Sequence, residues 1–177
     1  FYLTELTKDL MWGGNNTTQT DWVTQQLQLE IEPIKNWKTF VELNYKTINE
    51  MRDEARNMRP KYYINGDVYY DAGSKNSIYS RSDRTNFFNT NIYSEYTHVW
   101  NKHTFKGMVG FQAEVNHWRR IGAKKEDLIT EELPEINVAT GKEYAYSNNN
   151  HWATAGFFGR INYNYAERYL AEVNLRY

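Results

Sequence analysis

Four histidines are the first candidates for chemistry in this 177-residue chain, and they are scattered along the sequence. His98 and His103 flank one predicted turn, whereas His117 and His151 lie far from it. No third histidine or carboxylate near that pair has the spacing of a zinc-ligand set. The sequence contains no cysteine, which excludes thiolate ligands and disulfides. We therefore expect no metal site and no cofactor.

Carboxylates are the second candidate for chemistry. Asp127, Glu131 and Glu132 could form the acid–base pair of a glycoside hydrolase. They lie in a strongly charged segment, where solvated side chains are the more common outcome. The sequence also has no nucleophile elbow, no phosphate-binding loop and no dinucleotide fingerprint. We therefore expect a protein that is not an enzyme.

Aromatic side chains in the polar stretches are the third candidate, because flat rings can stack on sugar rings. The ligand-binding candidates that we select are Tyr69, Tyr70, Tyr144, Tyr146 and Trp152, with Tyr62 and Tyr63 near the first two. Packing of the same rings within a sheet is the alternative, and it is the more common role of such residues.

The composition bears on possible partners. The formal net charge is -1, so no basic face for nucleic acid is expected. Mean hydropathy is -0.85, and no apolar run approaches the roughly 18 residues of a membrane helix. Strands of a membrane β-barrel escape that test, because only alternate residues meet lipid.

Alternation of apolar and polar residues with a period of two dominates the chain and predicts an all-β protein. We expect an antiparallel up-and-down meander of six long strands, at about residues 22–32, 37–51, 85–100, 103–117, 152–165 and 168–177. Long polar loops are predicted at about 52–84, with a hairpin at Asn65-Gly66, and at about 118–151, with a short helix around 126–132. The last predicted strand reaches the final residue, which favours a fragment of a longer barrel.

Three features favour a transmembrane barrel. The connections alternate between short and long, as periplasmic turns and extracellular loops do. The second to fifth strands span about 14–16 residues, far above the usual length. Aromatic residues of the apolar face bracket the short turns, as an interfacial girdle would: Trp37, Trp100, Phe105, Tyr163, Tyr165 and Tyr169.

The strand registers can be predicted from parity, because directly opposed residues share a face. The expected pairs are Leu27 with Val41, Glu30 with Lys38, Ile92 with Phe111, and Ile161 with Val173. Five apolar residues fall on the polar side and do not fit: Phe40, Ile48, Met108, Phe158 and Leu170.

The last two strands carry a family resemblance. Residues 156–165 read GFFGRINYNY and residues 168–177 read RYLAEVNLRY. This closely resembles a barrel stretch of SusC-like TonB-dependent transporters, the outer-membrane importers of Bacteroidetes-type bacteria. Residues 87–93, 103–111 and 127–134 also look like that family. The likeness covers the chain from about Asn86 onward, whereas residues 1–84 carry no motif of the family.

The resemblance implies more than the residues alone do. It implies a barrel of about 22 strands around a plugged lumen, in the cell outer membrane and in contact with its lipid. Residues 1–177 would be part of that barrel, without the plug domain. The family also implies a SusD-like surface lipoprotein, energy from TonB, and a cargo of oligosaccharide or sometimes peptide. The alternative is a soluble β-sheet domain that binds glycan.

Overall fold

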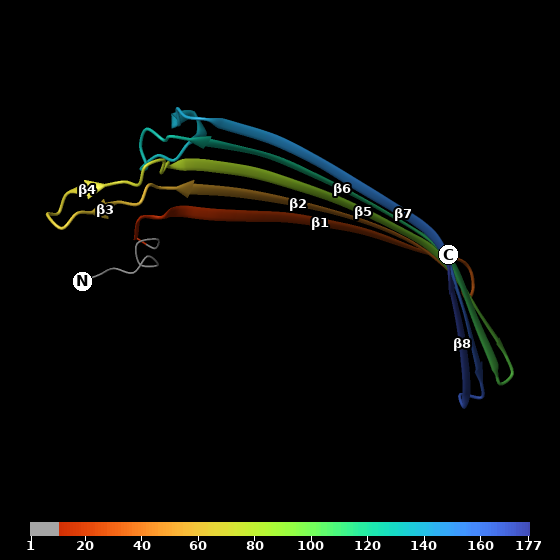
Figure 1. Cartoon of the computed structure of the whole chain (residues 1–177). Coiled ribbons are helices and arrows are strands. Elements are labelled where there is room, and N and C mark those ends of the chain that lie inside the picture. Colours follow the sequence, from red (N-terminus) through yellow and green to blue (C-terminus); the bar gives the residue numbers. More distant parts are fainter. Residues whose placement is uncertain (1–10) are drawn as a thin grey trace. The chain divides into compact units, whose positions relative to one another are not determined.

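The computed structural model describes residues 11–177 and shows an all-β protein (Figure 1). Six strands form one antiparallel sheet in the order β1-β2-β5-β6-β7-β8. Their bounds are Gly14–Ile34 for β1, Trp37–Arg56 for β2, Ser77–Trp100 for β5, His103–Glu126 for β6, Glu143–Tyr165 for β7 and Tyr169–Arg176 for β8. A separate hairpin pairs β3 (Lys61–Tyr62) with β4 (Val68–Tyr69), and a 3₁₀ turn covers Ile136–Val138. The predicted meander of six strands is confirmed.

The strands extend well into the predicted loops. β2 continues to Arg56, and β5 already begins at Ser77, within the expected 52–84 loop. β6 continues to Glu126, and β7 begins at Glu143, within the expected 118–151 loop. Polar residues occupy both faces there, so no apolar alternation marked these tracts as strands. The predicted helix around 126–132 is wrong, because Asp127 has φ 58° and Leu128 forms a β-bridge with Ala139.

The chain divides into two compact units, and each is described by itself. The loop unit comprises the described residues up to Asp21 together with Ile48–Arg84 and Arg119–Asn149, and it carries both long connections. The turn unit comprises Trp22–Thr47, Thr85–Trp118 and Asn150–Tyr177, and it carries the three short turns.

The contacts within the turn unit fit the predicted registers. Ile161 lies opposite Val173 in the β7–β8 pair. Glu30 and Lys38 form an ion pair at 2.6 Å. On the apolar face, the rings of Phe111 and Phe157 lie 5.2 Å apart between centroids. Residues that lie directly opposite each other on neighbouring strands share one face of the sheet, so the faces predicted from the sequence are correct here.

The apolar face of the turn unit is uncovered. In the described part of the chain no second sheet packs on it, since the only other strands are the two of the β3–β4 hairpin. Large apolar side chains of every one of its strands are exposed, among them Leu27, Trp37, Ile92, Val109, Phe157, Ile161 and Val173. A contiguous apolar surface of this kind marks a face that has a non-aqueous neighbour.

The opposite face is polar but carries a row of aromatic rings. Phe40 stacks on Tyr93 at 4.8 Å, and Tyr93 lies 6.4 Å from Phe158. A Cβ at Gly110 would come within 2.4 Å of the Phe158 ring, so only glycine lets that ring lie over the strand. The row explains why Phe40 and Phe158 do not fit the alternation. Both rings lie beside the Tyr93 ring on the polar face instead of on the apolar face.

Two turns show how local chemistry sets the chain direction. The predicted hairpin is confirmed, with Gly66 at φ 93° and its N–H donating to the Tyr63 carbonyl at 3.0 Å. Asn65 is not in the left-handed region, so Gly66 closes a three-residue loop instead of a two-residue Asn-Gly turn. The last short turn places Ala166 and Glu167 at φ 52° and 59°, and the Arg168 N–H donates to the Tyr165 carbonyl at 3.0 Å.

A glycine at position 167 should therefore stabilise the protein. The left-handed conformation costs a residue with a Cβ roughly 1–2 kcal/mol, and glycine avoids that cost. We expect Glu167→Gly to raise the free energy of unfolding by about 1 kcal/mol, measured by denaturant titration in detergent. Lys102→Gly is the control, because Lys102 also lies in a short turn but not at positive φ. Equal effects of the two substitutions would contradict this account of the turn.

The open edges of the sheet have a consequence for the isolated chain. β1 and β8 each have a neighbour on one side only, within the residues described. Unpaired edges recruit further strands. We expect residues 1–177, produced alone, to aggregate, and light scattering after refolding measures this. A monodisperse and cooperatively unfolding preparation would contradict the expectation.

Candidate functional site

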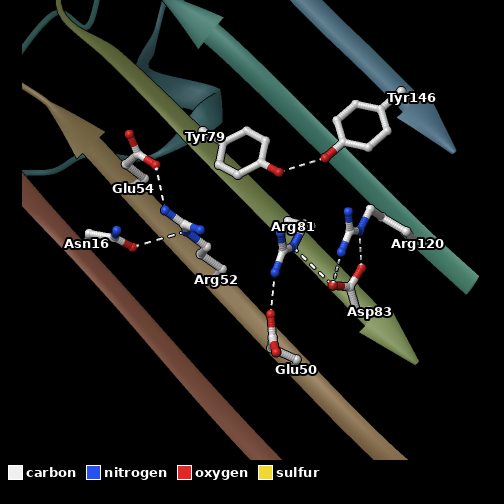
Figure 2. A network of polar contacts seen from close by, with 9 residues as sticks. All are labelled: Asn16, Glu50, Arg52, Glu54, Tyr79, Arg81, Asp83, Arg120 and Tyr146. Carbon is white, nitrogen blue, oxygen red and sulfur yellow. Dashed lines mark hydrogen bonds and ion pairs between the residues drawn. The ribbon is translucent and has the colours of Figure 1, made fainter. Parts of the chain in front are cut away.

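The polar face of the loop unit carries a ladder of paired side chains that crosses five strands (Figure 2). Alternate residues of a strand share one face, so β2 contributes Glu50, Arg52 and Glu54 and β5 contributes Tyr79, Arg81 and Asp83. Asn16 of β1, Arg120 of β6 and Tyr146 of β7 complete the set.

Asp83 is the centre of the ladder. It is 7% exposed and accepts hydrogen bonds from Arg120 through both carboxylate oxygens, at 2.6 and 2.8 Å. The Nε atom of Arg81 lies 3.1 Å from the same carboxylate, and Arg81 also donates to Glu50. Hydrogen bonding to Asp83 raises the pKa of the Arg120 guanidinium above its ordinary value. One buried carboxylate thus holds two guanidinium groups from neighbouring strands.

A second branch of the ladder joins the first two strands. Arg52 donates to the Asn16 amide oxygen at 3.2 Å and to Glu54 at 3.1 Å. Glu54 also accepts from Arg56 at 2.6 Å. The hydrogen bond from Arg56 lowers the pKa of the Glu54 carboxyl despite partial burial, and the charge of Arg52 adds to the effect. The bond from Arg52 to Asn16 thus links β2 to β1, whereas the contacts of Glu54 lie within β2.

The third branch is a pair of tyrosines. The hydroxyl groups of Tyr79 and Tyr146 lie 2.6 Å apart. A Cβ at Gly122 would come within 2.6 Å of the Tyr146 ring, so glycine allows the ring to lie flat over β6. Hydrogen bonding to Tyr79, followed by burial, raises the pKa of the Tyr146 hydroxyl.

The chemistry that this face offers is hydrogen bonding between fixed, mutually paired charges. Three arginines stand against three carboxylates in Figure 2, and Arg56 adds a further guanidinium beside Glu54. Among the described residues no group of three histidine or carboxylate side chains could hold a metal ion. A face of guanidinium, carboxylate, amide and hydroxyl groups offers hydrogen-bond donors and acceptors to a polar ligand.

The structure brings only part of the predicted aromatic set to this face. Tyr146 joins the ladder, and the Tyr144 ring of the same strand lies near two ammonium groups, 4.9 Å from Lys142 and 5.8 Å from Lys124. Tyr69 belongs to the β3–β4 hairpin, where it packs on Tyr63 at 4.3 Å, and Tyr70 follows it. Trp152 lies in the turn unit, 6.2 Å from Phe87.

The other candidate groups have local partners. His103 bonds through Nδ1 to the Tyr163 hydroxyl at 2.7 Å. Asp127 pairs with Lys75 at 2.7 Å, and Glu131 accepts the Met58 N–H at 2.9 Å. These two carboxylates connect the long segments of the loop unit.

Sequence reasoning missed the centre of the ladder. Arg81, Asp83 and Arg120 lie in the polar segments 52–84 and 118–151, which the sequence predicts as loops. Charged residues do recur on one face, at 50, 52 and 54 and at 81 and 83, but Asp53 and Arg84 place charges on the other face as well, so the sequence pattern does not single out the ladder.

Comparison with known proteins supplies a fold and no family. No family model matches the chain, and no curated protein matches it. Among the described residues no helix is long and apolar enough to cross a membrane.

Solved structures do match. The RagAB peptide transporter superposes with a TM-score of 0.81 at 17% identity, over 98% of this chain and 19% of the other. The RagAB peptide importer in its open-open state gives 0.82 at 18% identity, over 98% of this chain and 18% of the other. The closed-closed state gives 0.81 at 17% identity. The chain therefore has the fold of a segment of these proteins and spans about a fifth of their length.

Proposed function

We propose that this chain is part of the wall of an outer-membrane β-barrel, in a SusC-like, TonB-energised importer of oligosaccharides or similar nutrients. The observation that carries the proposal is the uncovered apolar face of the turn unit. A soluble sandwich buries such a face against a second sheet, whereas the face of a membrane barrel lies against lipid.

The strands suit that placement. About 9–11 tilted residues cross a bilayer, and β2, β5, β6 and β7 each have at least 20 residues. Within the sheet, the backbone N–H and C=O groups of neighbouring strands form hydrogen bonds with each other, as a lipid environment requires. The aromatic residues beside the short turns would lie at the periplasmic interface, and the loop unit would lie on the extracellular side.

The likeness to a peptide importer supports transport as the role of the whole protein, and oligosaccharide and peptide both remain candidate cargoes. The SusD-like lipoprotein and TonB enter the proposal through the family resemblance alone. The polar ladder would face the lumen, where it would contact passing cargo. The proposal assigns no catalytic step to this chain.

Cysteine labelling tests the placement directly, because the chain has no cysteine of its own. In the full-length protein that contains this chain, Asn65→Cys should react with a membrane-impermeant maleimide on intact cells. Glu167→Cys should react only after the outer membrane is permeabilised. The two positions are both exposed turn residues, so each controls for the reactivity of the other. Equal labelling on intact cells would refute the proposed topology.

A further inference from the structure

A cavity lies on the polar face of the turn unit, and no residue of the ladder lines it. Its volume is about 630 Å³, within the range of small-molecule sites. The floor is apolar and is formed by Tyr93, Met108 and Phe158. The Tyr93 hydroxyl donates to Glu42 at 3.1 Å, and the Phe158 ring lies over Gly110, so both rings are held in place.

The rim of the cavity consists of planar polar groups. Arg160 donates to the amide oxygen of Asn174 at 2.7 Å, and Arg176 donates to that of Gln112 at 3.0 Å. The Arg176 guanidinium thus contacts a neutral amide. Glu95, the carboxylate of the lining, is already paired with Lys106 at 2.9 Å. Arg160 also lies 3.9 Å from the Glu172 carboxylate. Arg176 is therefore the group of the rim that favours an anion, and its guanidinium fork matches a carboxylate.

The kind of ligand follows from which groups are available. β5, β6 and β7 are interior strands with neighbours on both sides, so their backbone groups are engaged in the sheet. β8 also lines the cavity and is an edge strand among the described residues, but its unpaired backbone groups point along the plane of the sheet and not out of its polar face. A peptide backbone would find few partners here. An aromatic floor suits the apolar face of a pyranose ring, while amides and guanidinium groups suit its hydroxyls and a ring carboxylate.

We infer that this cavity binds an acidic saccharide, a pyranose that carries a carboxylate, with the ring on Phe158 and Tyr93 and the carboxylate on Arg176. The inference rests on the proposed function for its biological role, since it names the class of cargo. Arg160 and the amides of Gln112 and Asn174 bind the hydroxyl groups. A neutral sugar of the same size lacks the contact with Arg176 and binds more weakly.

Calorimetric titration of the full-length protein in detergent tests this. The probes are a tetragalacturonate, a neutral galactotetraose and an acidic tetrapeptide. The unmodified protein should bind the tetragalacturonate most tightly. Arg176→Gln should weaken that binding at least tenfold, which is about 1.4 kcal/mol, and leave the galactotetraose affinity unchanged. Arg168→Gln is the matched control, because it removes the same charge from the last short turn, outside the cavity.

Arg176→Lys separates the guanidinium fork from simple charge and should recover only part of the affinity. Circular dichroism of each variant verifies that the fold is kept. Absence of tetragalacturonate binding at millimolar concentration would overturn the inference. So would equal loss in Arg176→Gln and Arg168→Gln, or tighter binding of the neutral sugar or the peptide. The labelling experiment is independent of ligand, so failure of this inference leaves the proposed membrane placement intact.

Discussion

Val41→Arg in the full-length protein should lower the free energy of unfolding by about 2–4 kcal/mol, whereas Asn44→Arg should cost far less. Arginine on the lipid face near the bilayer midplane carries that cost, and arginine in the lumen does not. Asn44 is on the polar face, since its amide donates to the Asn89 side chain at 3.2 Å. Val41 has the opposite parity in the same strand, which places it on the uncovered apolar face.

Denaturant unfolding in lipid vesicles measures both variants. The two substitutions add the same side chain to the same strand, so differences in strand propensity largely cancel. Equal costs, or a larger cost at position 44, would show that the faces of β2 are assigned the wrong way round.

Asp83→Asn is expected to destabilise the loop unit by about 3 kcal/mol. Removal of one partner from a buried charge pair leaves the other charge uncompensated, and this is typically worth about 3–5 kcal/mol. Here the side chains of Arg81 and Arg120 keep 15% and 30% exposure, which places the effect at the low end of that range. Two guanidinium groups would lose their shared carboxylate at once.

Asp53→Asn is the matched control. Asp53 lies on β2 in the same unit, but it is exposed and accepts one hydrogen bond, from the Ser80 hydroxyl at 2.6 Å. Its replacement should cost less than about 1 kcal/mol. Hydrogen exchange of the β5 and β6 amides around positions 83 and 120 locates the effect. Similar protection in both variants would mean that the ladder does not hold the loop unit together.

The sequence was most informative where apolar and polar residues alternate. The period of two around Val41, Ile92 and Ile161 placed these residues on one face, and the parity of the last turn predicted the pairing of Ile161 with Val173 that the structure shows. A strand with one apolar face records its orientation in its own residues, and no knowledge of its neighbours is needed.

The strand ends and the polar ladder were decided only by the tertiary structure. β5 begins at Ser77 and β6 continues to Glu126, although these tracts lack apolar alternation. Between these tracts Arg120 bonds to Asp83 and Arg81 bonds to Glu50, and no local pattern encodes pairs at such sequence separations. The same limit applies to the cavity of the turn unit. Each of Tyr93, Phe158 and Arg176 is an ordinary strand residue in sequence, and only the lateral order of β5, β6, β7 and β8 brings them around one volume. Period-two alternation fixes the face on which a side chain lies, whereas complementary charge and shape between strands can be recognised only after the strands are paired.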